Sequence, residues 1–251
     1  VSVMLEVLSE QLHTTRAIAE SDIDDVNIFI YSDTGGLKQH IYASGASHKI
    51  DIAPGRYSIY VAANIHQDMG DLSLTRLQSY AITAPTDEGT LTMIGSDTFT
   101  IDGSGQVLPI SLKRHAAKIV YNIAVDPAAG DIEISSVQLC SIPDREYLIT
   151  DLTAPTEPAS GFHDSEIRKF PDGSQRANGI FYMLTNRQGD VSSIASQDQK
   201  NPDKAPKYAS YLCIRGRSGE NKVVDFVVYL GSNMTTNFDV LPNEAHTYNI
   251  T

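Results

Sequence analysis

Residues 48–65 read His-Lys-Ile-Asp-Ile-Ala-Pro-Gly-Arg-Tyr-Ser-Ile-Tyr-Val-Ala-Ala-Asn-Ile, and no other stretch indicates a β-protein so clearly. Polar and apolar residues alternate strictly over His48–Ile52, which is the period of a strand with one buried face. Pro54-Gly55 then turns the chain, because glycine accepts positive φ without steric cost. Arg56–Ile65 is rich in β-branched and aromatic residues, and we expect it to return as a long strand.

The same pattern continues on both sides of this stretch. Short segments rich in Val, Ile and Tyr are separated by Gly, Pro, Asn and Asp, which is typical of all-β proteins. Only residues 70–80 are predicted to be helical, because leucines recur there at three-residue spacing. Two β-sandwiches in tandem fit the strand spacing better than one barrel. The predicted domains are residues 1–113 and 114–251.

The charge balance and the hydropathy pattern exclude several classes of protein. The 251 residues include 19 Lys and Arg against 31 Asp and Glu, which gives a net charge of −12. Nucleic-acid binding requires clustered basic residues that neutralise phosphates, and no such cluster is present. The negative charge also disfavours electrostatic binding to anionic lipid. Apolar runs such as Ile59–Ala63 and Phe226–Leu230 are far shorter than the ~20 residues of a membrane-spanning helix.

No residue pattern predicts catalysis or metal binding. The histidines do not occur at metal-ligand spacing, and Asp22, Asp24 and Asp25 lack the central glycine and closing glutamate of a calcium loop. A nucleophile elbow and a phosphate-binding loop are absent from the sequence. We therefore expect a protein that is not an enzyme and that has no cofactor or metal.

The two cysteines, Cys140 and Cys213, lie in apolar segments that are predicted to be strands. Their spacing resembles neither a metal knuckle nor a redox Cys-x-x-Cys motif. The main interpretation is a pair of buried free thiols, and the alternative is a disulfide across a sandwich.

Several short motifs spread over the chain carry a resemblance when they are taken in order. They are the Pro-Gly-x-Tyr strand in Ala53–Asn64, the Leu-x-Arg-x-x-Ala-Lys-Ile junction in Ile110–Ile119, Val137–Pro143, and the series Tyr229–Asn233, Asn237–Val240 and Asn243–Tyr248. Together they resemble the Bacteroidales fimbrillin superfamily of major and minor fimbrial subunits and fimbria anchor or tip proteins. Residues 181–189 depart from the family pattern, with Met-Leu-Thr where Leu-Pro-Glu is expected.

The resemblance implies two tandem transthyretin-like β-sandwiches with Greek-key-type topology. It also implies export to the cell surface as an outer-membrane lipoprotein, with the lipidated cysteine before Val1. The expected partners are other pilus subunits, the same or related, that assemble by strand exchange. Contact with the membrane is expected only through that lipid anchor, and a stalk, an anchor and a tip role all remain open.

The first predicted strand is a candidate for removal. Its apolar face consists of Val3, Leu5 and Val7, and Arg16 follows in a polar stretch of the kind that proteases cut. In this family an Arg-specific protease is expected to cleave at such a site. Cleavage between Arg16 and Ala17 would release residues 1–16 and leave an unpaired groove for a strand of a neighbouring subunit. The alternative is that the strand stays in place.

A second function is a cell-surface adhesin or glycan-binding module that recognises a host or bacterial receptor. Its contact face would be two long polar segments, Thr150–Asn178 and Arg187–Lys207, because loops of that length are uncommon in compact domains without a function. The absence of tryptophan weakens a lectin role, because sugar sites usually contain flat aromatic faces.

Overall fold

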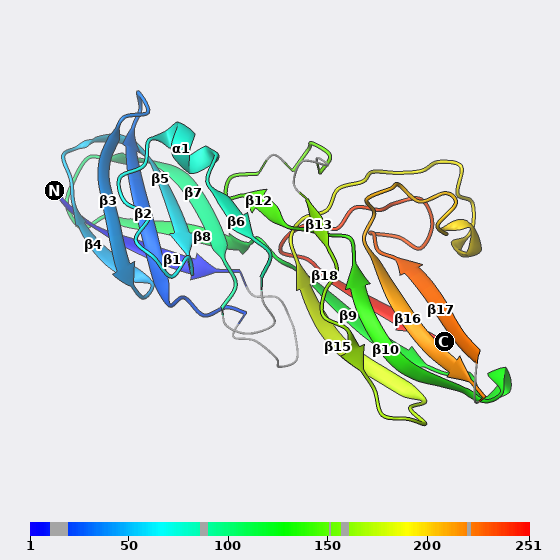
Figure 1. The fold of residues 1–251 in the computed structure, drawn as a ribbon. Coiled ribbons are helices and arrows are strands. Elements are labelled where there is room, and N and C mark those ends of the chain that lie inside the picture. Colours follow the sequence, from blue (N-terminus) through cyan, green and yellow to red (C-terminus); the bar gives the residue numbers. More distant parts are fainter. Residues whose placement is uncertain (11–19, 86–89, 151, 157–160, 220–221) are drawn as a thin grey trace. The chain divides into compact units, whose positions relative to one another are not determined.

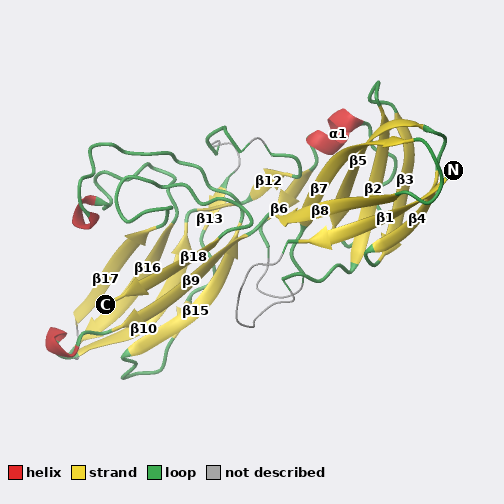
Figure 2. Cartoon of the chain, turned by 180° about the vertical axis from the view of Figure 1, so that it is seen from behind, coloured by secondary structure: helices red, strands yellow, loops and turns green. Residues whose placement is uncertain are grey.

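A computed structural model describes residues 1–10, 20–85, 90–150, 152–156, 161–219 and 222–251 of the chain. The described residues are almost all in strands or loops, and the few helical segments are short (Figures 1 and 2). The all-β class predicted from the sequence is confirmed. The residues group into two compact units, Val1–His115 with Tyr147–Thr150, and Ala116–Glu146 with Asp151–Thr251.

The first unit is built on one seven-stranded sheet with the strand order β3-β2-β5-β7-β8-β1-β4. Its elements are β1 (Ser2–Ser9), β2 (Asp25–Ser32), β3 (Leu37–Ser44), β4 (Ser47–Asp51), β5 (Gly55–Ala63), α1 (Leu74–Gln78), β6 (Ala81–Thr83), β7 (Met93–Ile101) and β8 (Val107–Arg114).

This sheet curls into two layers. Strands β7 and β8 pair only at Met93–Arg114 and Ile94–Lys113, and then they separate. One layer is β3-β2-β5-β7 and the other is β8-β1-β4, and apolar side chains of both layers form a single core. The start of β7 and the end of β8 therefore form the corner at which the sheet passes from one layer to the other.

The strands on either side of Pro54-Gly55 do not pair with each other, although the chain turns there as expected. Strand β4 pairs with β1, whereas β5 pairs with β2 and β7 in the other layer. The turn therefore carries the chain from one layer to the other.

Strand β2 is buried on both faces. Its inner face joins the core, and its outer face is covered by the segment between β5 and α1. Asn27 Nδ2 donates to the Gln67 carbonyl at 3.0 Å, and the Tyr31 hydroxyl donates to the Leu72 carbonyl at 2.9 Å. These bonds satisfy polar groups on a strand that water does not reach.

The second unit has a four-stranded sheet, β14-β10-β16-β17, and a three-stranded sheet, β15-β9-β18, with a shared apolar core. A separate two-stranded sheet, β11-β13, also belongs to this unit. The division between the two units falls within β12, after Glu146. The strands are β9 (Ala117–Ala124), β10 (Ile132–Cys140), β11 (Ile142–Pro143), β12 (Arg145–Tyr147), β13 (Phe162–His163), β14 (Arg168–Lys169), β15 (Arg176–Met183), β16 (Tyr211–Ser218), β17 (Lys222–Tyr229) and β18 (Ala245–Ile250), with 3-10 turns at Pro127–Ala129 and Gln197–Gln199.

Candidate functional site

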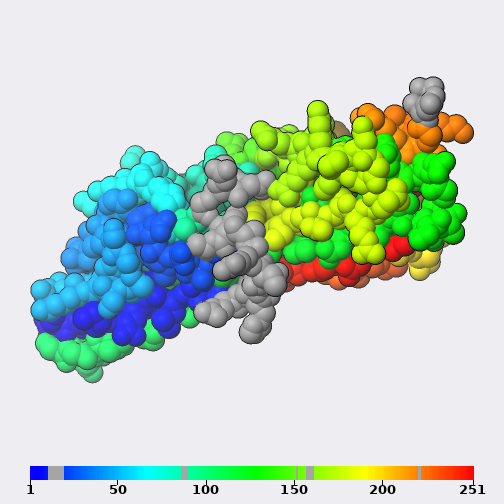
Figure 3. Space-filling view, turned by 90° about the horizontal axis from the view of Figure 1, so that it is seen from below, coloured from blue at the N-terminus to red at the C-terminus, as the bar shows by residue number. Residues whose placement is uncertain are grey.

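Strand β1 lies inside its layer, although it is the first strand of the chain. It runs parallel to β8 and antiparallel to β4, so that Leu5 lies opposite Leu108 on one side and His48 on the other. In Figure 3 the dark-blue residues at the start of the chain reach the surface of the first unit between light-blue and green segments. A strand in this position has backbone partners along both edges.

The side chains of β1 alternate between the core and the solvent. Val3, Leu5 and Val7 are at most 3% exposed and belong to the core of the first unit. Met4 and Leu8, on the other face, are 37% and 51% exposed. Burying an aliphatic side chain is worth about 1.5–3 kcal/mol, so the three inner residues of β1 contribute roughly 4.5–9 kcal/mol of apolar transfer energy.

Backbone hydrogen bonds extend along β1 on both sides. The Met4 amide donates to the Gln106 carbonyl and the Val7 amide donates to the Ala46 carbonyl, both at 2.8 Å. Removal of β1 would therefore leave unpaired groups on β8 and on β4, as well as an apolar groove. Unpaired backbone groups and exposed apolar side chains are both unfavourable in water, so a groove of this kind favours binding of another strand.

The predicted cleavage residues Arg16 and Ala17 lie outside the described residues. The chain on either side of residues 11–19 is described and well anchored. The Ser9 hydroxyl donates to the Ser21 carbonyl at 2.9 Å, and the Glu10 amide donates to the Leu112 carbonyl at 3.2 Å.

Two buried polar side chains hold the segment that leads into β2. Asn64 is 3% exposed and Arg114 is 2% exposed. Asn64 Nδ2 donates to the Asp22 carbonyl, and Arg114 Nε donates to the Glu20 carbonyl at 2.7 Å. Both side chains belong to motifs quoted above, but the sequence alone did not indicate what they contact.

The two cysteines are free thiols in the described structure. Cys140 is on β10 and Cys213 is on the neighbouring strand β16, opposite Gln138. Both residues lie in one sheet, so they do not face each other across the two layers, as the alternative of a disulfide across a sandwich would require. Burial raises the pKa of the Cys140 thiol to about 12, so the thiol stays protonated and unreactive at neutral pH.

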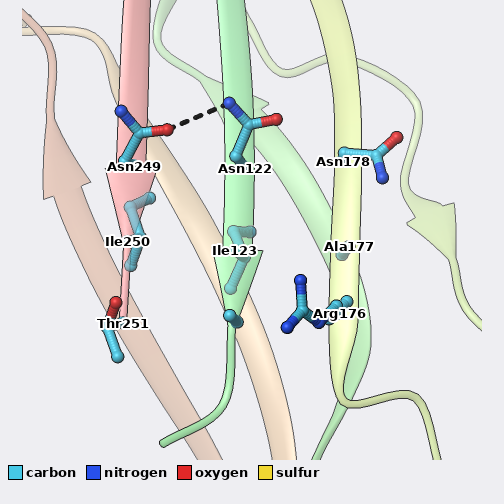
Figure 4. A pocket seen from close by; sticks show the side chains of 9 residues that line it. Asn122, Ile123, Arg176, Ala177, Asn178, Asn249, Ile250 and Thr251 are labelled. Atoms are coloured by element: carbon cyan, nitrogen blue, oxygen red, sulfur yellow. Dashed lines mark hydrogen bonds between the residues drawn. The ribbon is translucent and has the colours of Figure 1, made fainter.

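A shallow hollow lies on the outer face of the sheet β15-β9-β18, and its volume is about 400 Å³. Asn178, Asn122 and Asn249 form a row across the three strands, and Asn122 Nδ2 donates to Asn249 Oδ1 at 3.0 Å (Figure 4). Arg176 lies at one end of the hollow. The three asparagines that line the hollow can donate hydrogen bonds to hydroxyl groups and accept them, because each side-chain amide has an NH₂ donor and a carbonyl acceptor.

The two long segments singled out in the sequence are tied to the second unit. In Thr150–Asn178, the Ser165 carbonyl accepts from Gln138 Nε2 at 2.8 Å. In Arg187–Lys207, the buried amine of Lys200 donates to the carbonyls of Asn233 and Asn237 at 2.8 and 2.6 Å. Burial lowers the pKa of Lys200 to about 8. These bonds fix Ser165 and Lys200, one residue in each segment, against other parts of the second unit.

The described part of the chain holds no cluster of His, Cys, Asp and Glu placed to bind a metal. Among the described helices, none is long and apolar enough to cross a membrane.

Comparisons with known proteins agree with this architecture. A family model described as a domain of unknown function (DUF4906) matches residues 181–250. No curated protein sequence matches the chain. The tip fimbrial protein Mfa3 of Porphyromonas gingivalis, truncated at its C-terminus, is similar in structure, with a TM-score of 0.67 and 14% identity over 99% of this chain and 94% of that chain.

Two further solved structures are also similar. A candidate cell adhesion protein from Parabacteroides distasonis gives a TM-score of 0.69, at 15% identity over 99% of this chain and 88% of that chain. The fimbrilin FimA from Porphyromonas gingivalis gives 0.66, at 11% identity over 100% and 90%. The chain therefore has the fold of these fimbrial and adhesion proteins from Bacteroidales, the group that the sequence motifs resemble.

Proposed function

We propose that this protein is a structural subunit of a surface fimbria, or a fimbria-associated surface protein, and that it assembles by exchange of its first strand. Each of the domains 1–113 and 114–251 is then a transthyretin-like sandwich with Greek-key-type topology. The subunit is exported and held at the outer membrane as a lipoprotein, and it has no catalytic role. The names of the solved fimbrial structures with the same fold support this assignment.

One observation supports strand exchange above the others. Strand β1 is internal in its sheet, with partners on both edges and with Val3, Leu5 and Val7 in the core. A single cut between β1 and β2 separates β1 from every other described strand. In this proposal cleavage between Arg16 and Ala17 releases it, and a strand with the same apolar alternation from a neighbouring subunit takes its place.

Digestion of the folded chain with an Arg-specific protease tests the proposal. We expect a new N-terminus at Ala17, followed by higher-order species in size-exclusion chromatography and filaments in electron micrographs. Arg16→Gln should abolish both the cut and the assembly, whereas the control Arg56→Gln should retain them. Resistance of the Arg16–Ala17 bond while other arginines are cut would contradict the mechanism, and so would cut protein that remains monomeric.

A second candidate function is adhesion to a glycan or protein receptor. It is favoured by the hydrogen bonds that tie described residues of Thr150–Asn178 and Arg187–Lys207 to neighbouring parts of the second unit. Glycan-array and host-protein binding by the intact monomer, lost when these segments are replaced by short linkers in a chain that still folds, would support it. Binding that survives the replacement would rule out these segments as the contact face.

A further inference from the structure

Asn64 makes hydrogen bonds to the segment that leads into β2 with both polar atoms of its side-chain amide. Its Nδ2 donates to the carbonyls of Asp22 and Leu91, both at 2.9 Å, and its Oδ1 accepts from the Asp24 amide at 2.9 Å. Its own amide donates to the Asp25 carbonyl at 2.9 Å. The backbone of Asn64 is left-handed, with φ of 59°, a conformation that asparagine adopts more readily than most residues.

Arg114 binds Glu20, which comes shortly before the residues that Asn64 contacts. It is the last residue of β8, and its Nε donates to the Glu20 carbonyl at 2.7 Å. Glu20 is the first described residue after the stretch that contains Arg16. Two buried side chains, one beyond the end of β5 and one on β8, therefore fix the backbone from Glu20 to Asp25.

Neither anchor is part of β1. A hydrogen bond from Ser9 Oγ to the Ser21 carbonyl does join the two segments, and it would be lost when β1 leaves. The hydrogen bonds of Asn64 and Arg114 named above would remain, because their donors and acceptors lie outside residues 1–16. Buried hydrogen bonds are costly to break without replacement, so these contacts resist opening of the segment.

We infer that Asn64 and Arg114 are positioning residues that set the end of the exchangeable segment, so that β1 can leave while β2 stays in place. The inference rests on the proposed strand exchange. It gives the anchored segment Glu20–Asp25 a function, which is to keep the acceptor groove in shape when the chain before it has been cut. It also gives a physical role to two motif residues that lie outside β1.

Limited digestion of the full-length folded chain with a broad-specificity protease tests this inference. The new N-terminus of the retained fragment is identified by mass spectrometry. In the native chain we expect trimming to stop at or before Glu20. In Asn64→Gly, which keeps the left-handed backbone and removes the side-chain bonds, trimming should proceed into residues 21–25. In Arg114→Met it should pass Glu20.

The rate of trimming gives a second readout. Each net hydrogen bond that is lost should raise it about two- to tenfold, because proteolysis follows the population of the locally open state. Lys113→Met, one position away with its side chain exposed, is the matched control and should leave the N-terminus unchanged. Near-UV circular dichroism checks that each variant is folded. If Arg114→Met does not fold, Arg114→Lys and Asn64→Asp replace the larger changes.

Two results would overturn the inference: native protein trimmed past Glu20, or folded variants trimmed at the native position. This digestion does not require a cut after Arg16. Resistance of that bond to an Arg-specific protease would therefore count against strand exchange alone, and the anchoring of residues 20–25 would still be measured.

Discussion

Gly95 of β7 lies directly against the backbone carbonyl of Ser111 on β8, and there is no room for a Cβ at this position. The side chains of Ile110 and Leu112 would each be 2.9 Å from such a Cβ. Gly95 follows Ile94, the last residue of β7 that pairs with β8. Its missing side chain therefore lets the two strands cross closely where the sheet turns from one layer to the other.

Substitution of Gly95 by alanine should destabilise the first unit by about 1–3 kcal/mol, because the added methyl group would push β8 away from β7. Urea denaturation measures the change. Gly103→Ala is the matched control, since a Cβ there has no neighbour within 4 Å. Equal stability of the two variants would show that β8 can move freely at the corner.

Truncation of Leu5 should weaken the fit of β1. Leu5 is fully buried, so Leu5→Ala is expected to cost about 2–5 kcal/mol. Met4→Ala, on the outer face of the same strand, should cost within about 0.5 kcal/mol. The free energy of unfolding in urea checks both values. A Leu5→Ala variant as stable as Met4→Ala would mean that the inner face of β1 contributes little to holding it in the sheet.

The second unit should lose stability in mildly acidic solution through His246. Burial lowers the pKa of His246 below its usual value of 6.5, although Glu244 opposes the shift. The unfolded chain therefore binds a proton more readily than the folded chain as the pH falls below 6.5, and protonation favours unfolding. The contribution of neutral His246 to the free energy of unfolding is fully present above the unfolded-state pKa, and it is lost as the pH falls from there through the folded-state pKa.

Thermal unfolding at pH values between 7.5 and 5 measures this effect. His246→Gln should reduce the loss of stability on acidification, and the exposed His163→Gln serves as the control. Unchanged pH dependence in His246→Gln would assign the acid sensitivity to other groups.

Both cysteines should be present as thiols in protein purified without reductant. The intact mass should correspond to two free thiols, and Cys140 should resist alkylation at neutral pH because it is buried and protonated. Denaturant should expose both thiols to the reagent. A mass two daltons lower, or rapid labelling of Cys140 in the folded chain, would contradict the structure.

Local features of the fold could be predicted from the sequence, but strand partners could not. Strict alternation over His48–Ile52 gives a half-buried strand, and the structure has β4 there. The turn at Pro54-Gly55 suggests that the next strand returns beside it, yet β4 pairs with β1. Which strands pair depends on contacts between segments far apart in the chain, and a residue period carries no information about them.

In the candidate site, too, the local pattern of a strand could be predicted from the sequence, whereas contacts between distant residues could not. The buried face of β1 follows from the alternation of Val3, Leu5 and Val7, because a period of two places them on one side of a strand. The contacts of Asn64 and Arg114 leave no such trace, since they join side chains to backbone carbonyls with no periodic pattern. The row of asparagines across β15, β9 and β18 appears only when the register of the three strands is known.

The position of β1 between β8 and β4 also has a mechanical consequence. Strand β1 is bonded along both edges, and a force applied along its length would act parallel to both neighbouring strands. Traction then loads both rows of bonds in shear, so they must yield together and cannot open one after another. A joint of this kind fails slowly under load, at a rate set by its barrier to rupture.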